Sequence, residues 1–314
     1  MGSQPPLQLP TIDFSSLHKH DQGTLAWDAM KTQVLKALQQ FGCFEASFNQ
    51  ISLGLLESVF ASLKQLFYLP LETKQRNHHE NPVYGYIGPS KDNPLYESLG
   101  IEDIQSFTNI LWPHNGNPEF FENMKKYIEK LAELDEMVRM MVLECLNLEK
   151  YMVEHMELSK YITRVMRYRV PDEHEPELGL GDHADKNIVT ILRQDDVGGL
   201  QIQNKDGEWI EAKTSTANCF VVMAGESFHA WTNGRVRAPV HRVVMKGDQT
   251  RFSIGLFSVG KPGKFIKAPE EMVNEDYPLL FKPFDYEEFL KFFLLEENIG
   301  NKLALDKYCG VSSI

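Results

Sequence analysis

The feature that most constrains the fold is a change of hydrophobic period near Tyr161. Before it, apolar residues recur every three or four positions, which predicts helices over about 24–40, 51–69 and 118–148, with a short strand at 42–47. After it, the chain breaks into short apolar segments separated by Gly-, Asn- and Asp-rich turns, at 161–170, 187–192, 199–203, 208–212, 219–224, 241–245 and 251–258. Many short strands of this kind are typical of a sandwich or jelly roll.

The pattern therefore predicts a mainly β core with helices. We expect a double-stranded β-helix, or jelly roll, wrapped by an N-terminal helical region and by a C-terminal helix at 286–297. The predicted division is a helical region over 1–158 and the jelly-roll core with its C-terminal helix over 159–314. The length of 314 residues is compatible with one domain or two, so it does not test this division.

Charge and composition restrict the partners. The formal net charge is −12, which repels a phosphate backbone, so we expect no nucleic-acid partner. No apolar run approaches the roughly 18 to 20 residues of a membrane span, and the N-terminus lacks a signal-peptide pattern. The four cysteines are scattered without a CxxC pair, as in proteins with reduced thiols. We expect a cytoplasmic protein that binds a small molecule, with no membrane and no obligate protein partner.

The first motif with chemical content is His183-Ala184-Asp185. On a strand, residues two apart face the same side, so the imidazole and the carboxylate could share one metal ion. A histidine and a carboxylate two apart also arise by chance in a chain with 10 histidines. The sequence contains two such cases, at 78–80 in a polar loop and at 155–157 at a helix end, which we interpret as solvated surface.

The surroundings of His183 and Asp185 make the metal interpretation stronger. His241 begins another predicted strand of the same β region, and two histidines with one carboxylate leave open positions on Fe(II). Ten residues later, Arg251 and Ser253 lie two apart on a further strand. A buried arginine needs an anionic partner, and a free dicarboxylate would supply one through paired hydrogen bonds. The alternative is an ordinary surface ion pair.

At this point the sequence resembles a known family, the plant 2-oxoglutarate- and Fe(II)-dependent dioxygenases. The segments that resemble the family are HADKNIVTI, GGLQIQNKDGEWIEA, ESFHAWTNGRVRAPVHRV and RFSIGLFS, which contain the HxD…H iron motif of the family followed by RxS. Nearer the N-terminus, LPTIDFS and FGCFEAS match the N-terminal region of the family. The similarity is greatest to the subgroup with the glucosinolate side-chain dioxygenases, steroidal-alkaloid hydroxylases and deoxypodophyllotoxin synthase, with auxin oxidases more distant. The segments of this sequence that resemble this subgroup are LWPHNGNPEF, YRVP, LFKPFDYEEFL and YCGV.

The resemblance implies roles for individual residues. His183, Asp185 and His241 would bind iron, and Arg251 and Ser253 would hold the far carboxylate of 2-oxoglutarate. Where the family often has Asn-x-Tyr, this chain has Met166-Arg167-Tyr168. Tyr168 would still reach the co-substrate, whereas Met166 cannot donate a hydrogen bond and could line the substrate pocket instead. Glu226 replaces the usual Asp of the family and is not expected to bind iron.

The implied activity is oxidation of a small plant specialised metabolite with O₂, releasing succinate and CO₂, with ascorbate expected as reductant. The outcome could be hydroxylation, desaturation, ring closure or demethylation. Predicted pocket residues are Met166, Lys186, Trp231, Phe257 and Phe107, although the aromatic ones could equally be core residues. Three alternatives stay open: a catalytically silent jelly roll that binds a small ligand, an oxidase that uses ascorbate without 2-oxoglutarate, and an auxin-oxidase-like enzyme that inactivates a hormone.

Overall fold

Two sheets form the centre of the protein. The computed structural model describes residues 7–114, 116–212, 218–295 and 297–311. The larger sheet has the order β1 (Thr11–Asp13), β2 (Cys43–Ser47), β10 (Cys219–Ala224), β7 (Val189–Gln194), β12 (Arg251–Gly260), β5 (Ser159–Tyr168), β4 (Tyr96–Ile101) and β3 (Tyr86–Ile87). The smaller sheet has the order β6 (Leu178–His183), β11 (His241–Val244), β8 (Leu200–Gln203) and β9 (Trp209–Glu211). The predicted jelly roll is confirmed.

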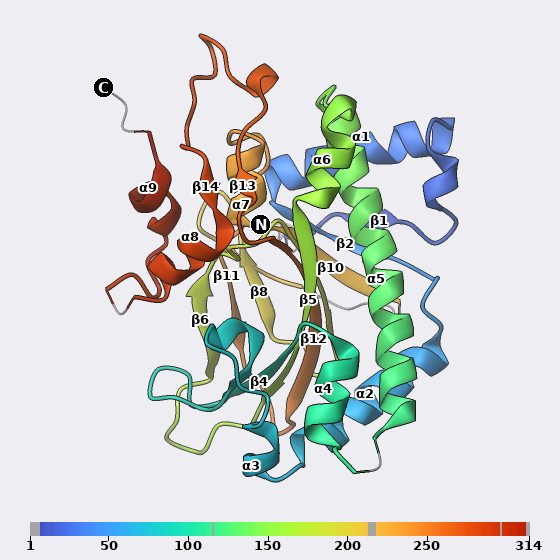
Figure 1. The fold of residues 1–314 in the computed structure, drawn as a ribbon, viewed down its shortest axis with the longest axis vertical. Coiled ribbons are helices and arrows are strands. Elements are labelled where there is room, and N and C mark those ends of the chain that lie inside the picture. Colours follow the sequence, from blue (N-terminus) through green and yellow to red (C-terminus); the bar gives the residue numbers. More distant parts are fainter. Residues whose placement is uncertain (1–6, 115, 213–217, 296, 312–314) are drawn as a thin grey trace, which may run out of the picture.

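Helices cover the outer face of the larger sheet (Figure 1). The long ones are α1 (Leu25–Gln40), α2 (Leu53–Phe67) and α5 (Pro118–Cys145), close to the predicted bounds. Each begins at a side-chain cap, because Thr24, Ser52 and Asn117 accept hydrogen bonds from backbone amides in the first turn. The shorter helices are α3 (Leu71–Lys74), α4 (Ile104–Leu111), α6 (Met152–Glu157), α7 (Glu226–Trp231), α8 (Tyr286–Phe293) and α9 (Ala304–Cys309). None of the described helices could span a membrane.

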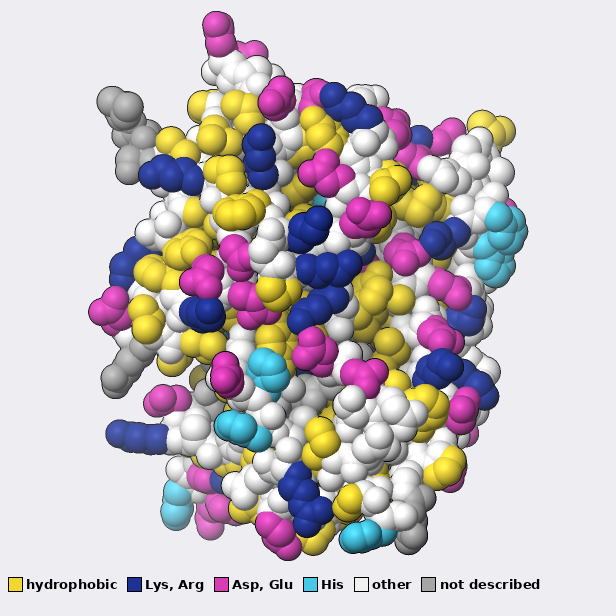
Figure 2. Space-filling view, in the orientation of Figure 1, with side chains coloured by type: hydrophobic (Ala, Val, Ile, Leu, Met, Phe, Trp, Pro, Cys, Tyr) yellow, Lys and Arg dark blue, Asp and Glu magenta, His cyan; other side chains and the backbone are white. Residues whose placement is uncertain are grey.

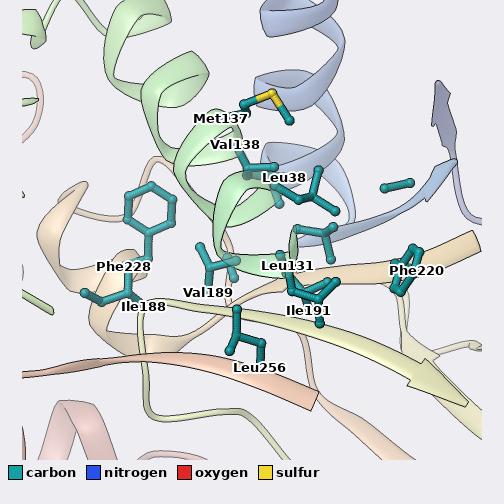
Figure 3. Close-up of a cluster of buried hydrophobic side chains, with 14 of the residues drawn as sticks. Leu38, Leu131, Met137, Val138, Ile188, Val189, Ile191, Phe220, Phe228 and Leu256 are labelled. Atoms are coloured by element: carbon teal, nitrogen blue, oxygen red, sulfur yellow. The ribbon is translucent and has the colours of Figure 1, made fainter. Parts of the chain in front are cut away.

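The main core lies between these helices and the larger sheet. Figure 3 shows Leu38 of α1 and Leu131 of α5 above Ile191 of β7, with Leu256 of β12 nearby. All four side chains are buried. Packing on this face holds the sheet rigid and leaves the opposite face of the same strands free to line a cavity.

A buried polar network ties α5 to the strands beneath it. Asp135 accepts hydrogen bonds from Arg139 at 2.9 Å, from Tyr161 at 2.9 Å and from Ser258 at 3.0 Å. Arg139 also donates to Ser159 at 3.0 Å. The charges of Asp135 and Arg139 are therefore paired within the core, which fixes the helix against β5 and β12.

The structure corrects the sequence analysis at several strands, including β3, β4 and β6. β3 and β4 lie in the half predicted to be helical and add to the sheet beside β5. β4 is buried on both faces, with Glu97 paired to Lys74 at 2.6 Å, so its sequence lacks the alternation that marks a strand. β6 contains Gly179 and Gly181, which strands usually avoid; the sequence analysis expects a strand at His183 but not over the residues before it.

Charges of both signs are mixed on the surface. On the face in Figure 2, acidic and basic side chains are interspersed. Across the protein, surface ion pairs include Lys302 with Asp182 and Lys246 with Glu211, both at 3.2 Å. The chemistry of the protein therefore has to be sought inside the jelly roll.

Candidate metal centre and co-substrate site

A largely apolar cavity lies between the two sheets. Its wall includes inward-facing residues of β5, β12 and β7 from the larger sheet and of β6, β11 and β8 from the smaller sheet. Tyr286, Leu290 and Phe293 of α8 complete it. The cavity has a volume of about 220 Å³ and opens to solvent.

Three side chains with metal-binding atoms converge in this cavity. The Oδ1 atom of Asp185 lies 3.7 Å from Nε2 of His183 and 3.6 Å from Nε2 of His241. Two donors in neighbouring positions on one metal ion, at bonds of about 2.1 Å, lie roughly 3.0–3.4 Å apart, so these atoms need only a small contraction to share an ion. Two imidazoles and one carboxylate are the donor set typical of Fe(II) oxygenases. Among the described residues, this is the one group of three that could hold a metal ion.

Both imidazole rings are held in the orientation that metal binding requires. Nδ1 of His183 donates to the carbonyl of Gly181 at 2.8 Å, and Nδ1 of His241 donates to the carbonyl of Pro239 at 3.2 Å. Each Nε2 is then left with its lone pair toward Asp185. Burial, together with the neighbouring His241, lowers the pKa of His183 to about 4, so this ring is neutral at pH 7.

Asp185 does not lie on a strand, contrary to the sequence argument. His183 is the last residue of β6, and Asp185 belongs to the turn that follows. Its position depends on Thr190 instead, whose hydroxyl donates to Oδ2 at 2.5 Å, and on its carbonyl, which accepts from the amide of Glu226 at 2.7 Å. The position of Asp185 is therefore fixed by two hydrogen bonds and not by a strand.

A buried cation lines the same cavity. Arg251 is 0% exposed, and its guanidinium donates to Gln194 at 2.9 Å and to Ser253 at 3.1 Å. The ring of Tyr168 lies 4.7 Å from the guanidinium carbon. No carboxylate of the described residues lies within ion-pair distance of Arg251, and burial lowers its pKa. Such a group fits a carboxylate ligand with two oxygens.

Met166 and Tyr168 also line the cavity. The hydroxyl of Tyr168 donates to the sulfur of Met166 at 3.8 Å, and burial raises the pKa of this phenol. Phe257 lies on the wall as well.

Lys186 lines the cavity, but its ammonium group is already paired. It lies 3.0 Å from Glu226 and 3.0 Å from the carbonyl of Ala184, and its charge sits 4.3 Å from the centre of the Phe293 ring. Burial raises the pKa of Glu226 to about 7, against the lowering effect of Lys186. The pair joins the turn after β6 to the N-terminus of α7 and contacts α8.

Two residues predicted for the substrate pocket lie elsewhere. Trp231 on α7 packs in a different cavity against His155, with ring centroids 4.3 Å apart. His155 is 1% exposed, so the interpretation of 155–157 as solvated surface was wrong for this residue. Phe107 on α4 stacks on Phe120 of α5 with centroids 5.8 Å apart. In each case a helix turns the aromatic ring into the core, so neither ring reaches the triad.

Comparison with known proteins agrees with this geometry. Residues 159–259 match the model of the 2OG-Fe(II) oxygenase superfamily, and residues 9–110 match that of the N-terminal region of non-haem dioxygenases in morphine synthesis. Over 300 residues, the chain is 46% identical to the probable 2-oxoglutarate-dependent dioxygenase AOP1.2 of Arabidopsis thaliana, covering 92% of each. The chain belongs to the 2OG-Fe(II) oxygenase superfamily.

Solved structures support the same assignment. The dioxygenase for auxin oxidation of rice is 26% identical and superposes with a TM-score of 0.79 over 97% of this oxygenase and 100% of the rice chain. The corresponding Arabidopsis thaliana protein in complex with 2-oxoglutarate is also 26% identical, with a TM-score of 0.76 over 86% of this chain and 100% of that chain. This oxygenase uses Fe(II) and 2-oxoglutarate in a reaction with O₂.

Several wall residues of this oxygenase were missed by the sequence analysis. Arg164 lies two positions before Met166 on β5, so the same period of two that places Met166 and Tyr168 could have placed it. Tyr286, by contrast, comes from α8, more than 100 residues beyond His183, and no local pattern connects the two.

Proposed function

We propose that His183, Asp185 and His241 bind the Fe(II) of this oxygenase. The observation that carries this assignment is the convergence of the two Nε2 atoms and one carboxylate oxygen, all within 4.8 Å of one another. The carbonyls of Gly181 and Pro239 already fix the imidazole rings, so little rearrangement is needed to take up the metal.

Arg251 and Ser253 hold the far carboxylate of 2-oxoglutarate in this proposal, with Tyr168 beside them. The support is the buried guanidinium without a carboxylate partner in the described part of the chain, in the same cavity as the triad. When bound, Fe(II) and 2-oxoglutarate activate O₂ and couple its reduction to decarboxylation of the 2-oxo acid and oxidation of the substrate. The apolar wall excludes water from this reaction.

The prime substrate is a small, mainly apolar plant metabolite, oxidised by hydroxylation, desaturation, ring closure or demethylation. The lining of the cavity supports this, because most of its residues are aliphatic or aromatic. Similarity to the AOP dioxygenases of Arabidopsis thaliana supports a role in plant metabolism. All four cysteines are free, which supports a cytoplasmic location; imaging of a fluorescent fusion would test that location.

The test is anaerobic titration of the purified protein with Fe(II) and then 2-oxoglutarate, followed by the weak visible charge-transfer absorption of their complex. We expect the band in the wild type and its loss in Asp185→Ala, because one of three metal donors is removed. Asp182→Ala, with its exposed carboxylate on β6, is the control and should keep the band. A wild type without the band, or Asp185→Ala with an unchanged band, would contradict the assignment.

A further inference from the structure

We propose that the prime substrate carries an anionic oxygen group, such as a carboxylate or sulfate, and that Arg164 binds it. The inference rests on the proposed function and adds a chemical class to the substrate. Its starting point is that the cavity contains two buried arginines, whereas 2-oxoglutarate needs only one of them.

Arg164 and Arg251 face the same cavity from neighbouring strands. In the register of β5 and β12, Arg251 pairs with Tyr168, and Arg164 lies four residues from Tyr168 on the same face. Four residues of strand span about 13 Å. The two arginines therefore start from separate places along the cavity wall. One small dicarboxylate bound to the metal and to Arg251 would leave Arg164 free to bind another ligand.

The strands beside Arg164 leave room for its side chain. Its register partners are Gly100 on β4 and Gly255 on β12. A Cβ atom on Gly255 would lie 2.8 Å from the ring of Phe257, and one on Gly100 would lie 2.7 Å from the backbone of Tyr84. Larger residues at these two positions would crowd Phe257 and Tyr84, and the glycines themselves place no side chain beside Arg164.

The charge of Arg164 has no counter-ion among the residues that the structure describes. Its Nη1 donates to the carbonyl of Val83 and its Nη2 to the hydroxyl of Ser98, both neutral acceptors. The guanidinium has five N–H donors, so these two bonds do not satisfy it. Arg164 is only 6% exposed, and a buried cation without an anion is costly.

Two other arginines of the protein, one buried and one partly exposed, are paired with carboxylates. Arg139 pairs with Asp135 at 2.9 Å, and Arg167, on the opposite face of β5, pairs with Glu97 at 2.6 Å. Glu287, the carboxylate next to Tyr286 on α8, is bonded to the hydroxyl of Tyr84 and the amide of Asn81. An anionic ligand in the cavity would give Arg164 the kind of partner that the chain supplies to Arg139 and Arg167.

A second donor lies in the same part of the cavity. Tyr286 of α8 lines the wall and is 3% exposed, yet its hydroxyl has no hydrogen-bond partner within the described ranges. Burial raises the pKa of Tyr286, and Arg164 is close enough to oppose that rise. The phenol is thus a neutral donor that can share an anion with the guanidinium.

The test compares matched acids and amides. The full chain, loaded anaerobically with Fe(II) and saturating 2-oxoglutarate, is titrated with phenylalkanoates of two to five methylene groups and with the corresponding carboxamides, and binding is followed by calorimetry. We expect at least one acid to bind about 10-fold or more tightly than its amide. Arg164→Gln should weaken that acid about 10- to 100-fold and leave the amide unchanged, and Arg164→Lys should retain part of the preference.

Two controls separate charge recognition from a structural role. Arg167→Gln removes the same charge from the opposite face of β5 and should leave the preference intact. Ser98→Ala removes a hydrogen-bond partner of Arg164 but keeps the charge, so it should also leave the preference intact. If Ser98→Ala behaves like Arg164→Gln, the role of Arg164 is structural and the inference fails.

The charge-transfer band of the 2-oxoglutarate complex is recorded in every titration. If the wild type lacks the band, the proposed function fails and this inference with it. If the band is present but acids bind no better than amides, do not bind, or act only by displacing 2-oxoglutarate, only the inference fails. Persistence of the acid preference in Arg164→Gln would overturn it as well.

Discussion

His183 and His241 are register partners on adjacent strands, with ring centroids 4.2 Å apart, and each ring is bonded through Nδ1 to the carbonyl two residues earlier. The same local contact therefore orients both imidazoles. Because the acceptors are backbone carbonyls within β6 and just before β11, the orientation of the rings follows from the backbone and does not depend on a further side chain.

The orientation of the Asp185 carboxylate, by contrast, depends on the side chain of Thr190. Thr190→Val removes the hydroxyl that donates to Oδ2 of Asp185 at 2.5 Å while keeping the size and shape of the residue. We expect Fe(II) affinity to fall about 10- to 100-fold, as for other partners of metal ligands. Competition with a chromophoric chelator measures the affinity. Thr163→Val, a buried threonine of β5 outside the cavity, serves as control, and equal affinities of the Thr190 variant and wild type would refute the role.

Arg251→Ala should weaken 2-oxoglutarate binding by about two to four orders of magnitude. The reason is the loss of two charge-assisted hydrogen bonds of roughly 1.5 to 3 kcal/mol each. Titration of the charge-transfer band gives the dissociation constant. Arg169→Ala, which removes a half-exposed arginine bonded to Glu175, should leave the constant unchanged. An unaltered constant in Arg251→Ala would contradict the co-substrate assignment.

Asp135→Ala should destabilise the fold by about 3–5 kcal/mol, because it leaves the guanidinium of Arg139 buried without its anion. Urea denaturation measures the free energy of unfolding. Glu133→Ala, on the same helix and 40% exposed at its side chain, should change it by less than about 0.5 kcal/mol. If both variants lose the same amount, the network does not anchor α5.

Two glycine substitutions should have opposite effects on stability. In Gly225→Ala the new methyl would lie 2.0 Å from the carbonyl oxygen of Asn187, so the turn before α7 must shift, at a cost of about 1–3 kcal/mol. In Gly54→Ala nothing lies within 4 Å of the methyl, and the α2 helix should gain about 0.5–1 kcal/mol. Thermal unfolding compares the two, and a stabilised Gly225→Ala would refute the clash.

The sequence analysis succeeded where a periodic pattern or a family motif was present. The strands that carry His241 and Arg251 have strong apolar patterns, and β11 and β12 begin at these residues. Asp185 was placed on a strand although it lies in a turn, because spacing alone does not distinguish a strand end from the residues after it. Its convergence with the histidines requires contacts between segments distant in sequence.

The pocket wall was harder to predict than the triad. Trp231 and Phe107 are as apolar as Phe257, and only tertiary packing decides which aromatic rings face the core and which face the cavity. Tyr286 could not be found because nothing in the sequence of α8 indicates which strands it covers. Arg164 could have been found by extending the period of two along β5, but its lack of a counter-ion is visible only in three dimensions.

The origin of the cavity wall has a consequence for how such a protein diversifies. The triad and Arg251 stand on or directly beside paired strands, whereas Tyr286, Leu290 and Phe293 belong to one short helix near the end of the chain. Part of the cavity wall therefore comes from a stretch of sequence separate from the strands that carry the reactive groups, although Arg164 of β5 also lines it. Mutations in α8 can reshape what the enzyme accepts without moving the strands that carry out the oxidation, so new selectivity is accessible without rebuilding the catalyst.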